Sequence, residues 1–129
     1  MHATGPFDVK LTPQPPSDGS VIGRMILDKT WHGDIEATSK GEMLAFSSGS
    51  SGSAGYVAME QVAGSVAGRS GTFVLQHSGV MTRGQGELVI SVVPDSGTGE
   101  LTGLSGSMQI DITPGGKHSY RFEYEVAGE

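Results

Sequence analysis

The chain lacks cysteine and asparagine altogether. Without cysteine there is no disulfide framework, no thiol nucleophile and no thiolate metal site, and without asparagine there is no acceptor for N-linked glycans. Apolar runs stay well short of the roughly 18 to 20 residues that a membrane-spanning helix needs, and no basic segment followed by an apolar one marks a signal peptide. We therefore expect a soluble, cytoplasmic protein that makes no contact with membranes.

Positive charge is also scarce. Eight Lys and Arg residues stand against fourteen Asp and Glu, which gives a formal net charge of −6. Proteins that bind nucleic acids neutralise phosphates with clustered basic side chains, and no such cluster is present. We expect no nucleic-acid partner. At 129 residues the chain has the size of one domain, so residues 1–129 are predicted to form a single domain.

Glycine, by contrast, is abundant, at 21 of 129 residues. It destabilises helices by about 1 kcal/mol relative to alanine, but it suits turns, bulges and strongly curved strands. Alternation of apolar and polar residues, the period of a half-buried strand, recurs throughout the chain. It predicts strands over residues 5–11, 23–31, 35–46, 56–63, 71–81, 87–93, 100–112 and 120–126.

Turn-forming sequences separate these segments. The predicted connections are residues 13–19, 32–34, 47–53, 94–95 and 114–116, and Gly41 is predicted to form a bulge or bend. Consecutive strands joined in this way form an antiparallel meander, and eight strands suffice to close it. The fold class is therefore predicted as all-β, a closed eight-stranded antiparallel meander barrel. Its interior is wide enough for side chains or for one small ligand.

Two segments carry a family resemblance. The stretch from Gly97 to Gly106 (GTGELTGLSG) and the later YRFEY at 120–124 resemble the glycine-spaced motif and closing strand of allene oxide cyclase and dirigent barrels. Nearly the whole chain resembles a bacterial family known only as a domain of unknown function and grouped with the allene oxide cyclase-like barrels. The matching segments are 23–25, 28–30, 39–44, 55–58, 68–73, 76–79 and 93–97. The resemblance implies an allene oxide cyclase-like barrel with a possible ligand cavity, and it names no substrate.

A carboxylate and an imidazole are predicted to meet inside the barrel. In the hairpin that turns near residues 67–68, Glu60 lies opposite Leu75 and diagonal to His77. Burial and mutual charge would make the two an acid/base pair. Alternatively, Lys29 neutralises Glu60, and His77 simply satisfies a polar neighbour. A register slip of one residue would remove the pair and turn Gln76 inward.

Lys29 shares its predicted face with Met25, Leu27 and Trp31. A lysine that points inward needs a carboxylate partner or loses its proton, which leaves a Schiff-base role open as well. Lys29 joins Glu60 and His77 as the third polar residue predicted to point into the barrel. The candidate catalytic residues are Glu60, His77 and Lys29.

The closing strand is predicted to turn its aromatic residues inward, because its alternate residues are charged. Aromatic side chains and one amide make up the candidate ligand-binding set, which is Trp31, Tyr56, Phe73, Gln76, Tyr120 and Tyr124. The other histidines lie at ends or turns and share no metal-ligand spacing with His77. We expect no metal and no cofactor.

Apolar residues also occupy outward positions, namely Val57, Met59 and one face of residues 88–93. We expect the protein to form a homo-oligomer that buries these residues. Three functions stay open at this stage. The barrel binds a small apolar or aromatic ligand, or it is a cofactor-independent isomerase, cyclase, lyase or proton-transfer enzyme that uses Glu60 and His77, or it is a structural or interaction protein with a filled core.

Overall fold

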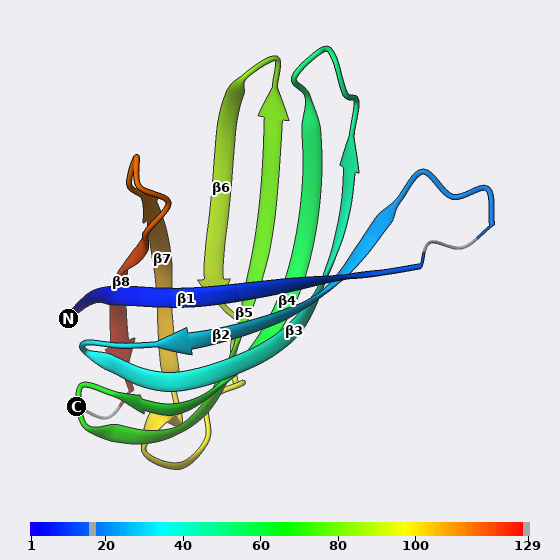
Figure 1. Ribbon diagram of the computed structural model, residues 1–129. Helices are drawn as coiled ribbons and strands as arrows, with labels where there is room; N and C mark the ends of the chain where they lie inside the picture. Colours follow the sequence, from blue (N-terminus) through cyan, green and yellow to red (C-terminus); the bar gives the residue numbers. More distant parts are fainter. Residues whose placement is uncertain (16–17, 128–129) are drawn as a thin grey trace.

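In the computed structural model, which describes residues 1–15 and 18–127, eight antiparallel strands close into a barrel (Figure 1). Each strand pairs with the next, and β8 pairs back with β1. The strands are β1 (His2–Gln14), β2 (Gly23–Trp31), β3 (Ile35–Ser47), β4 (Ala54–Val66), β5 (Arg69–Thr82), β6 (Gln85–Val92), β7 (Leu104–Ile112) and β8 (His118–Val126). The predicted closed, eight-stranded, antiparallel barrel is confirmed. In this part of the chain no helix has the length and apolarity to cross a membrane.

The first strand is longer than the sequence predicts. Pro13 and Gln14, expected in a loop, continue the pairing of β1 with β2. Beyond Phe7, β1 has no partner on the β8 side, so its second half is an edge strand, where proline is tolerated. Residues 16–17 of the same expected loop lie outside the described residues.

The seventh strand is shorter than predicted. Residues 99–101, expected at its start, form a 3-10 turn, η1 (Gly99–Leu101), and β7 begins only at Leu104. The Leu101 side chain is fully buried beneath the barrel, and the Thr98 N–H just before the turn donates to the Thr72 carbonyl. This connection therefore closes one end of the barrel.

Gly41 forms no bulge, because the pairing of β3 with β2 and with β4 continues without interruption through it. It lies opposite Leu27 on one side and Glu60 on the other. A Cβ atom at position 41 would overlap the Met59 carbonyl oxygen and crowd Glu60. Glycine is therefore required here for close approach of the strands.

The closed end of the barrel holds a packed aromatic core. Phe73 stacks on Phe122 with ring centroids 6.1 Å apart, and Trp31 meets Tyr120 edge-on at 5.2 Å. Burial of such rings is the main apolar contribution to the stability of this end. The largest fully buried side chains include Trp31, Tyr120, Phe73, Phe122, Ile35, Leu75, Ile90 and Leu101.

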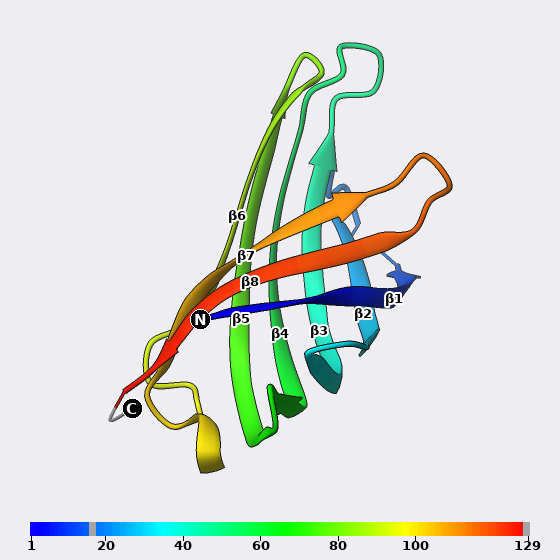
Figure 2. The ribbon, with the colours of Figure 1, turned by 90° about the vertical axis from the view of Figure 1, so that its left-hand side faces the viewer.

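The opposite end is splayed. β6 and β7 are joined by two register pairs, Ile90 with Met108 and Ser91 with Ser107. Beyond them β6 continues upward beside β5, whereas the β7–β8 hairpin leans away, as Figure 2 shows. The barrel is thus closed and packed at one end and open at the other.

Candidate functional site

Four polar side chains are buried inside the barrel where its packed end meets its open end. They come from four consecutive strands and have exposed fractions of 6%, 3%, 1% and 3%, in the order Lys29 (β2), Ser39 (β3), Glu60 (β4) and His77 (β5). Such groups are costly to bury unless each has a partner. Every buried side-chain nitrogen and oxygen in the described part of the chain does have one.

Glu60 is the centre of this network. Its Oε1 accepts hydrogen bonds from Lys29 Nζ at 2.8 Å and lies 2.5 Å from His77 Nε2, while its Oε2 accepts from Ser39 Oγ at 2.6 Å. Glu60 lies opposite Leu75, as the sequence predicts, so the register that brings it to His77 is confirmed. Lys29 pairs with the same carboxylate, and both contacts that the sequence left as alternatives are present together.

The surroundings of the network explain how it is accommodated. Gly41 has no side chain on the strand between Lys29 and Glu60, which leaves room for the ion pair to span β3. The ammonium group also lies 5.0 Å from the Trp31 ring centroid, within cation–π range. Trp31 Nε1 in turn donates to Ser39 Oγ at 3.1 Å.

The carboxylate is held in its charged form. Burial acts to raise the pKa of Glu60, but the hydrogen bond from His77, the charge of Lys29 and the hydrogen bonds from Lys29 and Ser39 outweigh it and lower the pKa to about 2. Glu60 is therefore an anion at neutral pH. It is suited to orient its neighbours and, being so well stabilised, is a weak proton acceptor.

Tyr56 extends the network toward the open end. Its hydroxyl lies 3.5 Å from His77 Nδ1, and the two rings are inclined to each other at 6.3 Å. Burial and then the charge of Glu60 raise the pKa of Tyr56, which keeps the phenol protonated. The ring lies over Gly79, where a Cβ atom would overlap it.

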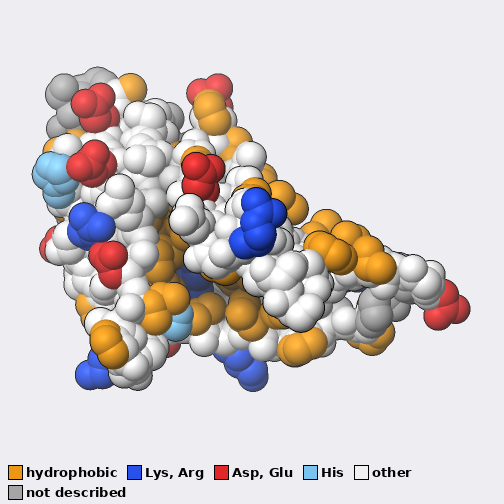
Figure 3. Space-filling view, turned by 90° about the horizontal axis from the view of Figure 1, so that it is seen from above, with side chains coloured by type: hydrophobic (Ala, Val, Ile, Leu, Met, Phe, Trp, Pro, Cys, Tyr) orange, Lys and Arg blue, Asp and Glu red, His pale blue; other side chains and the backbone are white. Residues whose placement is uncertain are grey.

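A cavity of about 720 Å³ fills the open end of the barrel. It exists because several inward positions there carry small side chains, among them Gly23, Ala45, Gly79 and Gly86. Seen from above, hydrophobic side chains surround the hollow in the middle of the molecule (Figure 3). The alternative in which side chains fill the whole barrel does not fit this cavity, because only the closed end is packed.

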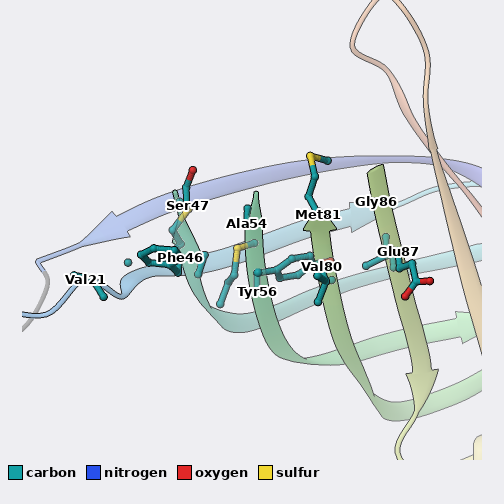
Figure 4. A pocket seen from close by; sticks show the side chains of 16 residues that line it. Val21, Phe46, Ser47, Ala54, Tyr56, Val80, Met81, Gly86 and Glu87 are labelled. Carbon is teal, nitrogen blue, oxygen red and sulfur yellow. The ribbon is translucent and has the colours of Figure 1, made fainter. Parts of the chain in front are cut away.

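The wall of the cavity is almost entirely apolar. In Figure 4 the Tyr56 ring lies between Phe46 and Val80, with Val21 at the left-hand end of the labelled residues and Glu87 at the right-hand end. The lining residues are Val21, Gly23, Met25, Met43, Ala45, Phe46, Ser47, Ala54, Gly55, Tyr56, Gly79, Val80, Met81, Gly86, Glu87 and Leu88.

Of the six residues predicted to bind a ligand, Tyr56 lines this cavity. Trp31, Phe73, Tyr120 and Tyr124 also point inward, but they belong to the packed core at the other end and do not line this cavity. Alternation shows which face of a strand a residue occupies but not its height along the barrel.

Gln76 does not line this cavity either. It lies on the outer face of β5, exposed to solvent, where it lines a groove on the outer wall of β2 to β5. Its inward placement required a register slip of one residue, and the observed register has none.

Ser39 is the network residue that the sequence analysis missed. It alternates in step with the fully buried Ile35 along β3, so the alternation of this strand could have revealed it. The sequence analysis also did not name Met25, Met43 and Met81, which line the cavity, as ligand-binding residues. No group of three or more His, Cys, Asp or Glu side chains that could hold a metal ion occurs among residues 1–15 and 18–127.

Comparison with known proteins places the chain in a family. Residues 3–124 match the family model described as "Protein of unknown function (DUF3224)". The chain is also similar to a protein of unknown function from the DUF3224 family of Shewanella oneidensis MR-1, known from its crystal structure. The two are 52% identical, with a TM-score of 0.93 over 100% of this chain and 98% of the other. No curated protein matches. The chain therefore belongs to the DUF3224 family, whose function is not known.

Proposed function

We propose that this barrel binds a small apolar molecule in the cavity at its open end. The cavity itself carries the proposal, because its volume of about 720 Å³ lies within the range of small-molecule sites and its wall exposes apolar groups to water. Covering such groups is favourable by roughly 25 cal/mol per Å². Met25, Met43 and Met81 are flexible enough to follow the outline of different ligands.

The proposal also covers two further points, the allene oxide cyclase-like subtype of the barrel and a cytoplasmic location of the protein. A closed barrel with a cavity in its lumen is consistent with the allene oxide cyclase-like subtype that the sequence resembles. A cytoplasmic location stays a prediction from the sequence, and fractionation of cells followed by immunodetection would test it.

The binding experiment fills the cavity and compares it with an equivalent change outside. Ala45 points into the cavity, whereas its neighbour Leu44 points outward and is 47% exposed. The probe is N-phenyl-1-naphthylamine, an uncharged dye that fluoresces strongly in apolar surroundings. We expect saturable binding to the wild type, a loss of at least tenfold in affinity in Ala45→Trp, and little change in Leu44→Trp.

Two results would overturn the proposal. One is the absence of saturable binding by the wild type, and the other is equal binding by Ala45→Trp in protein shown by circular dichroism to be folded. A loss shared by both tryptophan variants would place the dye on the outer wall.

Acid/base catalysis is the second candidate, favoured by the contact of Tyr56 with His77, which links the cavity to the buried carboxylate. In this reading His77, oriented by Glu60, accepts a proton from a bound substrate through or beside Tyr56, without a cofactor. A suitable assay is the uptake of deuterium from D₂O by 2-tetralone, which has acidic C–H bonds. Unchanged exchange in Glu60→Gln, with the ketone still bound, would reject it.

Self-association is the remaining part of the proposal. The outward row formed by Leu44, Val57 and Val89 on β3, β4 and β6 is exposed at 47%, 52% and 62%. A second copy of this chain would bury this apolar wall. Sedimentation equilibrium of the wild type and of Val57→Glu tests this, because a wild type that stays monomeric at all concentrations contradicts it.

A further inference from the structure

The proton donors of the buried network all point toward Glu60. Lys29 Nζ donates to Oε1, Ser39 Oγ donates to Oε2, and Trp31 Nε1 donates to Ser39 in turn. The direction of each hydrogen bond follows from one fact, that an ionised carboxylate can only accept. The Ser39 hydroxyl therefore donates its hydrogen bond to Glu60 and accepts one from Trp31.

The same rule fixes the tautomer of His77. Its Nε2 lies 2.5 Å from the Glu60 carboxylate and must carry the proton that it shares with this anion. Lys29 already neutralises Glu60, so a second positive charge in this apolar interior would have no counter-ion. One carboxylate serves both Lys29 and His77, so the neutral imidazole is the form that leaves no unmatched charge here, and in that form Nδ1 is an acceptor.

Tyr56 supplies the donor that Nδ1 needs. The phenolic oxygen is 3.5 Å from this nitrogen, a distance at the outer limit of a hydrogen bond. If Tyr56 turned its proton elsewhere, the buried Nδ1 of His77 would lose its hydrogen-bond donor. The free-energy cost of leaving this acceptor unpaired exceeds what one hydrogen bond to a neutral ligand returns. Once the phenol proton points to His77, the phenolic oxygen presents only lone pairs to the cavity.

Resting on the proposed binding role of the cavity, we propose that the ligand is an uncharged apolar molecule with a hydroxyl group, which donates a hydrogen bond to the Tyr56 oxygen. The rest of the wall is Gly, Ala, Val, Leu, Met and Phe, apart from Ser47 and Glu87 near the mouth. Tyr56 is therefore the polar anchor deep in the cavity. A donated hydrogen bond also polarises the phenol and strengthens its contact with His77.

Other ligand chemistries fit this arrangement less well. A ketone or an ether offers only an acceptor and would face the lone pairs of Tyr56. A carboxylate would add an anion near Glu60, whose own charge is already balanced by Lys29, and would pass Glu87 at the mouth. The chemistry of the anchor thus distinguishes alcohols and phenols from their close analogues.

The test compares four probes of the same ring system: naphthalene, 2-naphthol, 2-methoxynaphthalene and 2-naphthoate. Affinities are measured by displacement of N-phenyl-1-naphthylamine from the wild-type protein at neutral pH. One neutral hydrogen bond corresponds to roughly a fivefold gain in affinity. We expect 2-naphthol to bind at least fivefold more tightly than naphthalene or 2-methoxynaphthalene, and 2-naphthoate to bind more weakly than all three.

Tyr56→Phe identifies the anchor. It keeps the ring over Gly79 and removes the hydroxyl, so the preference for 2-naphthol should fall to less than twofold while naphthalene binds unchanged. Tyr124→Phe is the matched control, because it removes a phenol from the packed core outside the cavity, and it should keep the preference.

The outcomes separate this inference from the function on which it rests. If none of the probes displaces the dye, or the dye itself does not bind, the cavity is not a binding site and both proposals fail. If naphthalene and 2-naphthol bind equally well to the wild type, the cavity binds ligands but the hydroxyl anchor is refuted. Tighter binding of 2-methoxynaphthalene or 2-naphthoate refutes the assigned direction of the hydrogen bonds, as does a preference that survives Tyr56→Phe.

Discussion

Glu60→Gln is the substitution that the structure predicts most sharply. The amide has the shape of the carboxylate but no charge, and it places an NH₂ group among donors that all point inward. Lys29, only 6% exposed, loses its counter-ion. Breaking a buried ion pair by removing one partner costs about 3 to 5 kcal/mol, a large part of the 5 to 15 kcal/mol that stabilises a typical domain.

The assay is equilibrium unfolding in urea at pH 7, followed by fluorescence. Trp31 is the single tryptophan of the chain and is 1% exposed, so its emission reports the loss of the packed end. The matched control is Glu42→Gln, which removes an exposed partner of Arg24 at 2.9 Å and should cost less than about 1 kcal/mol. The double variant Lys29→Met/Glu60→Gln should regain much of the loss, because it removes both charges.

The expected signature is therefore a large loss in Glu60→Gln, a small one in Glu42→Gln and partial recovery in the double variant. A loss of less than about 1 kcal/mol in Glu60→Gln would refute the reasoning, because it would mean that Lys29 has no need of its counter-ion. A double variant less stable than Glu60→Gln would show that packing around Lys29, not its charge, is what matters.

Three further predictions concern stability. The pKa of Glu60 is about 2 in the folded protein, below its ordinary value of 4.5, so the ionised carboxylate contributes about 3 kcal/mol to the free energy of unfolding. This contribution is complete above pH 4.5 and is lost as the pH falls through about 2. Urea midpoints measured from pH 6 to pH 2 should therefore fall more steeply in the wild type than in Glu60→Gln. Gly41→Ala should cost about 1 to 3 kcal/mol, because the new methyl group overlaps backbone, whereas Gly55→Ala, with its nearest neighbour at 3.9 Å, should change the free energy of unfolding by less than about 0.5 kcal/mol. Tyr120→Phe removes the acceptor of the Ile35 N–H at 2.8 Å and should cost about 1 to 3 kcal/mol by the same urea assay, and no change would contradict the role of that bond.

The strand pattern could be predicted from the sequence because alternation of apolar and polar residues reports directly on the two faces of a strand. Residues 23–31 form β2 with the predicted bounds, and Lys29 and Trp31 share the inward face as expected. The hairpin register followed from the turn near residues 67–68, and with it the meeting of Glu60 and His77. These features depend on local spacing, which the sequence contains.

The height of a residue along the barrel axis depends on non-local geometry, so the sequence pattern could not separate residues of the packed end from residues of the cavity. Phe73 and Tyr56 are both inward aromatic residues of neighbouring strands, yet one lies in the packed core and the other lines the cavity. The difference arises because β7 and β8 lean away from β6 beyond Ile90, and no alternation pattern encodes that divergence. The 3-10 turn at residues 99–101 was missed for a similar reason, since it is stabilised by burial of Leu101 beneath the distant strands.

The position of the buried network follows from the division of the barrel into two ends. Large aromatic side chains fill the closed end, and small residues such as Gly79 and Ala45 leave the open end hollow. Glu60 lies where the two meet, and its partners on β2, β3 and β5 link four neighbouring strands at that level. The polar network therefore stabilises the floor of the cavity, and Tyr56 is the point at which that floor meets a ligand.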